Sequence, residues 1–313
     1  MEKEFGFGVD IGGTSCKIGL FDKEGNLLEK WQIHTHRENC GESILRDVAE
    51  SVLGKMKERT ISCEQVIGIG VGIPGPVSEN GKVGRVTNIE WDQKDVAGEL
   101  GELTGLMVRV GNDANVAALG EYVHGSGQGR KSLVMITLGT GVGGGVVMNG
   151  RIIHGANGAG GEIGHIKVSE DEIETCGCGK TGCLEQYASA TGIVRMAKNA
   201  LRTDNRPTIL KAEGLTAKDV LDAARQKDEL AMEVVERVGK ILGKAIADVA
   251  SILDPSIIVL GGGVSKAGDV LVEVVAKNYR KYTFHACENT PIVEASLGND
   301  AGIYGCMGML LTE

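Results

Sequence analysis

Runs of apolar residues divide the first part of the chain into short strands and one helix. Strands are expected at 5–10, 15–22 and 27–35, where glycine and asparagine turns separate the apolar runs. Residues 43–59 repeat apolar side chains at helical spacing, and the uninterrupted run at 66–74 is typical of a buried strand. This pattern predicts an antiparallel meander that leads through a helix into a buried strand.

A second meander is expected later in the chain. Residues 132–155 read as strand, glycine-rich turn, strand, Asn149-Gly150 turn and strand, and Asn-Gly is a strong hairpin signal. Two such meanders predict weak internal symmetry, with the two glycine corners on opposite sides of one cleft. The remaining expected elements are helices at about 94–104, 116–125, 215–226, 229–253 and from about 300, strands at 107–115, from 256 and at 291–295, and a surface loop at 201–215.

Composition limits the class of protein. The 313 residues suffice for one large or two medium domains, and the net charge of −9 argues against nucleic acid as the main partner. No apolar run approaches the ~20 residues of a membrane-spanning helix, and the acidic N-terminus is not expected to be a signal peptide. The eight cysteines are therefore expected to be reduced thiols of a cytoplasmic protein, some of them in a metal site. The 48 glycines gather in short runs, which predicts close approach of the backbone to other groups.

The segment 161–185 holds the most informative chemistry. Three thiolates and one imidazole make a complete tetrahedral zinc set. Buried free cysteines or a disulfide would be a plainer explanation, but core packing explains three cysteines within eight positions poorly. Because four protein ligands leave no position for water, the metal is expected to be structural. The expected ligands are His165, Cys176, Cys178 and Cys183.

Two carboxylates bracket this segment. A metal would hold Glu162 and Glu185 in place, and acidic acceptors around a rigid loop suit a polyhydroxylated ligand better than an anion. His165 is expected to place one ring nitrogen on the metal and to donate from the other. Asn88 is a further candidate for a hydroxyl contact.

Three glycine-rich corners follow strands, at 10–14, 139–145 and 261–265. Exposed backbone N–H groups at such corners can bind phosphate oxygens. None matches a P-loop or a dinucleotide fingerprint, and each alone could be a tight turn. Together they favour binding of nucleotide phosphates. Asp10, beside the first corner, could cap backbone N–H groups, but a contact to Mg²⁺ held mainly by phosphates is the favoured interpretation.

Asp113 lies between a buried strand and a helix, in the sequence Gly-Asn-Asp-Ala-Asn. An Asn-Asp pair there could simply cap the helix. The end of a strand is also where an α/β sheet places a general base, and phosphoryl transfer to a hydroxyl needs a carboxylate that accepts the alcohol proton. With the nucleotide features, Asp113 is expected to be catalytic and Asn112 to orient the acceptor.

These motifs together resemble the ROK family of sugar kinases and sugar-responsive repressors, over nearly the whole chain. Within the family, the chain is similar to bacterial glucokinases of the Gram-positive kind. The resemblance rests on DxGGT at 10–14, GNDAN at 111–115, LGTGVGGG at 138–145, GAGGEIGH at 158–165, CxCGxxGCLE at 176–185 and LGGGVS at 260–265.

The resemblance implies an α/β, actin-like ATPase (ribonuclease H-like) fold with two α/β domains around a central cleft. The smaller domain would comprise 1–115 and 298–313, so that the last helix folds back on it. The larger domain would comprise 116–297, with the zinc-binding segment at 162–185. The implied assembly is a homodimer or homotetramer.

The implied activity is transfer of the ATP γ-phosphoryl group to the 6-hydroxyl of glucose, with Mg²⁺ and structural zinc as cofactors and Asp113 as catalytic base. The substrate-binding residues would be Asn88, Asn112, Asp113, Glu162, His165 and Glu185. The nucleotide-binding residues would be Asp10, Gly12, Gly13, Thr14, Lys17, Thr137, Gly139, Thr140, Gly141, Gly261, Gly262 and Gly263.

Three alternatives share these motifs. A kinase for fructose, mannose or N-acetylmannosamine would use the same acceptors for shared ring hydroxyls, and polyphosphate could replace ATP as donor. A sugar-responsive repressor of the family carries a helix-turn-helix domain before the kinase-like part. Only four residues precede the first expected strand here, which favours a kinase.

Overall fold

The computed structural model describes residues 2–78, 81–84, 86, 89–264 and 269–312. The strands are β1 (Phe5–Ile11), β2 (Ser15–Asp22), β3 (Leu27–His34), β4 (Val66–Ile73), β5 (Lys82–Val83), β6 (Lys94–Asp95), β7 (Val108–Asn112), β8 (Ser132–Leu138), β9 (Val142–Met148), β10 (Arg151–Ile152), β11 (Ile258–Gly261) and β12 (Ile292–Glu294). The helices are α1 (Glu38–Gly41), α2 (Ile44–Arg59), α3 (Val96–Thr104), α4 (Asp113–His124), α5 (Glu185–Ala188), α6 (Ala190–Thr203), α7 (Ala217–Arg225), α8 (Glu229–Leu253), α9 (Asp269–Tyr282) and α10 (Ala301–Leu311). Within these described ranges, no helix combines the length and apolar character needed to cross a bilayer.

Two five-stranded sheets have the same strand order. The first runs β3-β2-β1-β4-β7 and the second β10-β9-β8-β11-β12. In each sheet a run of three consecutive strands is extended by a parallel strand, β4 beside β1 and β11 beside β8. The repeated meander that the sequence predicts is therefore confirmed. Asn149 and Gly150 both have positive φ, as the predicted hairpin turn between β9 and β10 requires.

The chain divides into two compact units. Unit 1 contains Met1–Gly129, Gly145–Gly161 and Asn299–Glu313, and unit 2 contains Arg130–Gly144 and Glu162–Gly298. This division differs from the expected boundary at residue 115, because α4 packs against α10 and both helices belong to unit 1. The prediction that the last helix folds back on the N-terminal part is confirmed by the contacts of α10 with β1 and β4.

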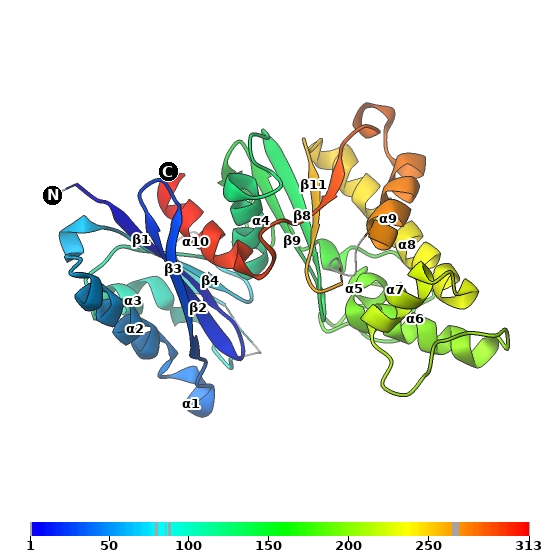
Figure 1. Cartoon of the computed structure of the whole chain (residues 1–313), viewed down its shortest axis with the longest axis horizontal. Helices are drawn as coiled ribbons and strands as arrows, with labels where there is room; N and C mark the ends of the chain where they lie inside the picture. Colours follow the sequence, from blue (N-terminus) through cyan, green and yellow to red (C-terminus); the bar gives the residue numbers. More distant parts are fainter. Residues whose placement is uncertain (1, 79–80, 85, 87–88, 265–268, 313) are drawn as a thin grey trace. The chain divides into compact units, whose positions relative to one another are not determined.

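In unit 1, helices cover both faces of the first sheet (Figure 1). The strand sequences explain which helix lies where, because β1 and β4 alternate glycine with large apolar residues. The large side chains join the core beneath α2 and α3. The glycines face α10, where a Cβ at Gly8 would lie 2.2 Å from Ile303 O and one at Gly70 would lie 1.9 Å from Cys306 O. These glycines therefore serve packing of a helix on a sheet.

Gly305 of α10 lies still closer to its neighbour, helix α4, and we expect Gly305→Ala to destabilise unit 1 strongly. A Cβ there would lie 1.5 Å from Val116 O of α4, so backbone must move. Overpacking of this kind costs about 1–3 kcal/mol, and more where only backbone can yield. Urea unfolding followed by circular dichroism measures the loss. Gly54→Ala in α2 is the matched control, because its Cβ meets no atom within 4 Å and alanine favours a helix by about 1 kcal/mol. Equal stability of Gly305→Ala and wild type would contradict the packing argument.

In unit 2, the long helix α8 packs against α9, α7 and α6. The expected surface loop at 201–215 begins inside α6, which ends at Thr203, and its other residues form no helix or strand. The strand expected at 107–115 is also shorter than predicted. Strand β7 ends at Asn112 and α4 begins at Asp113.

Candidate functional site

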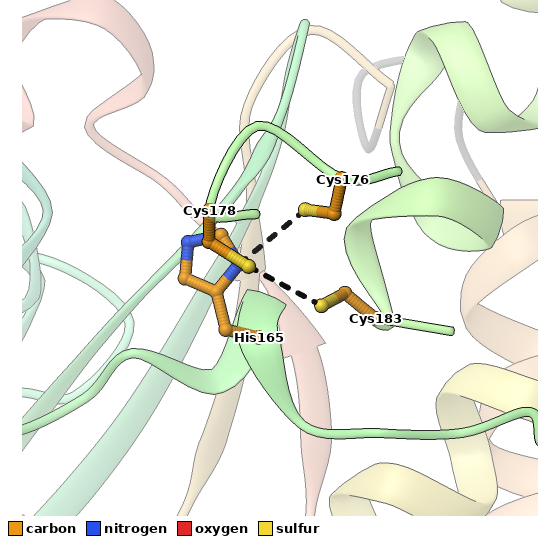
Figure 2. A group of neighbouring side chains, drawn as sticks. All are labelled: His165, Cys176, Cys178 and Cys183. Carbon is orange, nitrogen blue, oxygen red and sulfur yellow. Dashed lines mark hydrogen bonds between the residues drawn. The ribbon is translucent and has the colours of Figure 1, made fainter. Parts of the chain in front are cut away.

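His165, Cys176, Cys178 and Cys183 lie together in unit 2, as their spacing predicts (Figure 2). Their ligand atoms all lie within 4.8 Å of one another. Cys178 Sγ is 3.6 Å from Cys183 Sγ, and Cys176 Sγ is 3.7 Å from His165 Nδ1. A turn in which the N–H of Cys176 donates to Lys180 O at 2.7 Å brings the cysteines to one side.

These four side chains fit a tetrahedral zinc ion. Bonds of about 2.3 Å to sulfur and about 2.0–2.1 Å to nitrogen place tetrahedral ligands about 3.5–3.8 Å apart, which matches both separations. A disulfide needs about 2.05 Å between the sulfurs, and all these cysteines are free. Burial raises the pKa of Cys183 to about 12 and also raises that of Cys176. A bound cation would therefore be needed to hold both sulfurs as thiolates at neutral pH.

Two carboxylates flank the cluster, as expected. Glu162 Oε2 lies 3.8 Å from His165 Nε2, so the two ring nitrogens of His165 face different groups. Glu185 Oε1 lies 3.7 Å from Cys176 Sγ, and its Oε2 accepts a 2.9 Å hydrogen bond from the N–H of Val142. Glu185 therefore connects the cysteine segment to the glycine corner that follows β8.

Two glycine corners leave the same edge of the second sheet, because they follow the parallel neighbours β8 and β11. A Cβ at Gly139 or Gly263 would meet no atom within 4 Å, so the backbone there is open to a ligand. Gly262 has a φ of +90°, and a Cβ would lie 2.4 Å from Leu138 O, so this position requires glycine. Open backbone at adjoining corners is suited to the phosphates or the nucleoside of a nucleotide.

The remaining glycine corner lies in unit 1, between β1 and β2. The N–H of Gly12 donates to Ser15 O at 3.1 Å and closes the corner. Thr35 is only 2% exposed, and its Oγ1 donates to Gly12 O at 2.7 Å while its N–H donates to Thr14 O at 3.0 Å. Thr35 was not among the site residues expected from the sequence, where its signal is no more than a hydroxyl residue at the end of a strand of the same meander.

Asp10 lies near the end of β1, beside this corner. Its Oδ2 is 4.0 Å from Lys17 Nζ, which donates to Asn299 O at 2.9 Å. Burial raises the pKa of Asp10 to about 6, against the opposing charge of Lys17 and with a further increase from Asp113. A divalent cation would restore the charged carboxylate, so Asp10 fits a place near a metal–phosphate group.

We expect Asp10→Asn to stabilise the ligand-free protein at pH 7.5 by about 3 kcal/mol, and to have little effect near pH 4. The folded pKa of about 6 lies above the ordinary value of 3.8. The contribution of Asp10 to stability is therefore fully present below pH 4 and is lost as the pH rises through 6. Urea unfolding of both proteins across this range gives the difference. A difference that stays constant with pH would contradict the assignment to Asp10.

Asp113 and Asn112 meet at the start of α4. Asn112 Oδ1 accepts from the N–H groups of Ala114 and Asn115, and its Nδ2 donates to Gly75 O at 3.0 Å and to Asp113 Oδ1 at 3.1 Å. Asn112 is therefore the helix cap. Ala114 N–H also donates to Asp113 Oδ1, so both neighbours bond to the same oxygen, and no hydrogen bond to Oδ2 is found among the residues that the structure describes. Burial raises the pKa of Asp113, against these hydrogen bonds.

The expected site residues separate into the two units, and Asn88 lies outside the described residues. Thr137 lies opposite Gly261 on the neighbouring strand. Unit 1 holds Asp10, Gly12, Gly13, Thr14, Lys17, Asn112 and Asp113. Unit 2 holds Thr137, Gly139, Thr140, Gly141, Glu162, His165, Cys176, Cys178, Cys183, Glu185, Gly261, Gly262 and Gly263.

Known proteins match the chain almost from end to end. The model of the ROK family matches residues 6–313. A glucokinase of Halalkalibacterium halodurans is 43% identical over 95% of this chain and 92% of its own length. A ROK family glucokinase from Streptomyces griseus, solved in complex with glucose and AMPPNP, superposes with a TM-score of 0.77 at 33% identity over 97% of this chain and 98% of that one. A ROK hexokinase from Thermus thermophilus gives a TM-score of 0.83 at 33% identity, over 98% and 97% of the two chains.

Proposed function

Because the chain belongs to the ROK family, we propose that it is an ATP-dependent glucokinase, which forms glucose 6-phosphate and ADP. One observation carries this proposal, the 43% identity to a glucokinase over 95% of the chain. The fold agrees with it, since the solved structures that superpose on the chain include a ROK glucokinase. An actin-like ATPase fold with two α/β units is the architecture of such an enzyme.

Asp113 is the proposed catalytic base. Its Oδ2 would accept the proton of the glucose 6-hydroxyl as the 6-oxygen attacks the γ-phosphorus of ATP. The new bond joins that oxygen to phosphorus, the bond from phosphorus to the bridging oxygen breaks, and ADP leaves. A raised pKa makes Asp113 a stronger base, and the hydrogen bonds from Ala114 and Asn112 fix its orientation.

Glu162, His165 and Glu185 are the proposed acceptors and donors for the ring hydroxyls of glucose. The carboxylates of Glu162 and Glu185 lie beside the cysteine cluster, and Nε2 of His165 faces Glu162. This arrangement supports a shared role in binding the sugar. Zinc, when bound to His165 and the three cysteines, supplies a rigid framework and takes no part in the reaction. Asn112 would act on the sugar only through Asp113, because capping α4 already occupies its amide.

The three glycine corners are the proposed nucleotide site. The corners at 12–14 and 139–141 would bind phosphates through backbone N–H groups, and 261–263 would contact the nucleoside. Mg²⁺, held mainly by the phosphates and approached by Asp10, would neutralise the charge that develops in transfer. ATP as the donor and three thiols that bind a metal both fit a reducing cytoplasm. The assembly we propose is a homodimer or homotetramer.

A coupled ADP-release assay with Mg-ATP and a panel of sugars tests the proposal. The panel contains glucose, mannose, fructose, glucosamine, N-acetylglucosamine and N-acetylmannosamine. We expect glucose to give the highest kcat/KM by roughly tenfold or more, the worth of about 1.4 kcal/mol in transition-state binding. A higher value for another sugar would keep the mechanism and change the substrate. Binding of glucose with no ADP release from any sugar would contradict the enzymatic role.

A further inference from the structure

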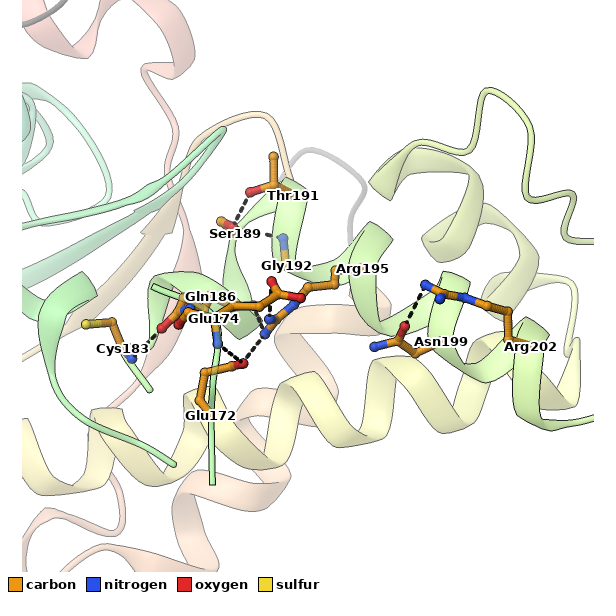
Figure 3. Close-up of polar contacts among 10 residues, drawn as sticks. All are labelled: Glu172, Glu174, Cys183, Gln186, Ser189, Thr191, Gly192, Arg195, Asn199 and Arg202. Atoms are coloured by element: carbon orange, nitrogen blue, oxygen red, sulfur yellow. Dashed lines mark hydrogen bonds and ion pairs between the residues drawn. The ribbon is translucent and has the colours of Figure 1, made fainter. Parts of the chain in front are cut away.

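Arg195, on α6, is the centre of an ion-pair network that the proposed reaction does not use (Figure 3). Its Nη2 donates to Glu172 Oε2 at 2.5 Å and to Gln186 O at 3.0 Å, and its Nη1 donates to Glu174 Oε2 at 2.8 Å. The guanidinium also lies over the ring of Tyr187, 5.3 Å from its centre. One side chain therefore joins α6 to two separate stretches of chain.

Both of these stretches carry cysteines of the proposed zinc site. Glu172 and Glu174 precede Cys176, and Gln186 follows Cys183. Gln186 couples the stretches further, because its Oε1 accepts from the N–H of Cys183 at 3.1 Å and its Nε2 donates to Glu174 O at 2.8 Å. We call the stretch 172–176 the Cys176 arm and the stretch 183–186 the Cys183 arm. The contacts of Arg195 and Gln186 thus hold the two arms together.

The ion pair of Arg195 with Glu172 is largely buried, unlike an ordinary ion pair on the surface. The side chain of Glu172 is only 9% exposed and that of Arg195 only 24%. The contact with Arg195 lowers the pKa of Glu172 to about 2, so Glu172 is charged at neutral pH. Zinc with three thiolates and one imidazole carries a net charge of −1. Without Arg195, Glu172 and Glu174 would lose their shared cationic partner. Their negative charges would then repel the negatively charged metal–thiolate group.

We infer that Arg195 is a positioning residue of the metal site, which holds the Cys176 and Cys183 arms at ligating separation before and after the metal binds. This inference rests on the proposed zinc site. Partners of metal ligands typically change metal affinity by 10–100-fold when they are removed. Loss of Arg195 is therefore expected to accelerate release of zinc.

Arg202 provides a matched control on the same helix. It is an exposed arginine whose contacts are local, with Lys198 O at 3.4 Å and Asn199 Oδ1 at 3.0 Å (Figure 3). Replacing either arginine with methionine removes a charge and keeps an unbranched stem on α6. Only Arg195→Met removes contacts to the cysteine arms.

The test measures transfer of zinc from the purified full-length protein to a chromophoric chelator in excess. We expect Arg195→Met to release zinc roughly 10–100-fold faster than wild type, and Arg202→Met to release it at the wild-type rate. Glu172→Gln, which keeps the shape of the buried partner, should also accelerate release, and it serves as the second variant if Arg195→Met does not fold. The urea midpoint of each metal-free protein separates loss of metal binding from general unfolding.

The outcomes distinguish this inference from the proposed function. Absence of zinc in wild-type protein purified with zinc present would overturn the metal site itself, and the inference with it. Zinc in wild type, with equal release rates for the folded Arg195 and Glu172 variants, would overturn the role of Arg195 alone. Faster release from Arg202→Met than from Arg195→Met would also overturn it.

Discussion

Replacing Asp113 with asparagine is expected to lower kcat for glucose phosphorylation by roughly 10²–10⁴-fold, the usual contribution of a positioned base. Asparagine keeps the size of the side chain, and its Oδ1 can still accept from Ala114 N–H at the start of α4. The amide cannot take the proton of the 6-hydroxyl, which we propose Oδ2 of the wild-type carboxylate accepts. The effect should therefore fall on kcat, while the dissociation constant of glucose changes little.

Steady-state kinetics with glucose and ATP, together with calorimetric titration of glucose, separate these two quantities. Asp95→Asn is a suitable control, because Asp95 also stands at a helix start in unit 1 and its Oδ1 accepts from Gly98 N–H at 3.0 Å. Asp95 has no proposed part in catalysis, so its variant should keep the wild-type kcat. A kcat near wild type in Asp113→Asn would remove Asp113 from the mechanism.

Local patterns in the sequence predicted the parts of the fold that depend on local physics. The meanders follow from short alternating strands and glycine turns, and both occur, with Asn149 and Gly150 in the expected conformation. The cluster at 165–183 could be predicted because its ligands lie close in sequence, so that few arrangements of the chain can keep them apart. The structure brings all four together, with their ligand atoms within 4.8 Å of one another.

Contacts between distant segments could not be predicted in the same way. The glycine runs predicted close approach of the backbone to other groups without showing which groups, and for several glycines of β1 and β4 the neighbour is α10, far along the chain. The boundary expected at residue 115 separates α4 from α10, although these helices pack together in unit 1. The sequence of α4 alone does not show which helix it contacts. Thr35 and Arg195 are ordinary polar residues in sequence and acquire a role only through partners on other elements.

Asn112 shows how a correct motif can still leave a role open. The sequence allowed both a cap and a substrate contact for the Asn-Asp pair. In the structure Asn112 is the cap, and the two neighbours of Asp113 bond to Oδ1 rather than Oδ2, so we propose that the pair divides these tasks. The distinction depends on which atoms point along the helix axis, and residue spacing carries no information about that.

Cys178→Ser is expected to release zinc and to raise the KM for glucose by roughly tenfold or more, with a smaller effect on the KM for ATP. Cys178 is exposed, so serine should leave the core intact, and the change acts through the metal. A serine oxygen is a poor replacement for a thiolate that lies 3.6 Å from Cys183 Sγ in a tetrahedral set. Without the metal, the segment that positions Glu162, His165 and Glu185 should loosen.

Cys63→Ser is the control for this experiment, because Cys63 is also exposed and free but belongs to unit 1, whereas the cluster belongs to unit 2. Zinc content and the two KM values are measured on each protein. A zinc-free Cys178→Ser enzyme with the wild-type KM for glucose would show that the metal does not organise the sugar site. A parallel rise in both KM values would instead favour transmission through Glu185, since that carboxylate also holds Val142 N–H at the phosphate corner. The ratio of the two KM changes therefore decides whether zinc supports the sugar alone or both substrates.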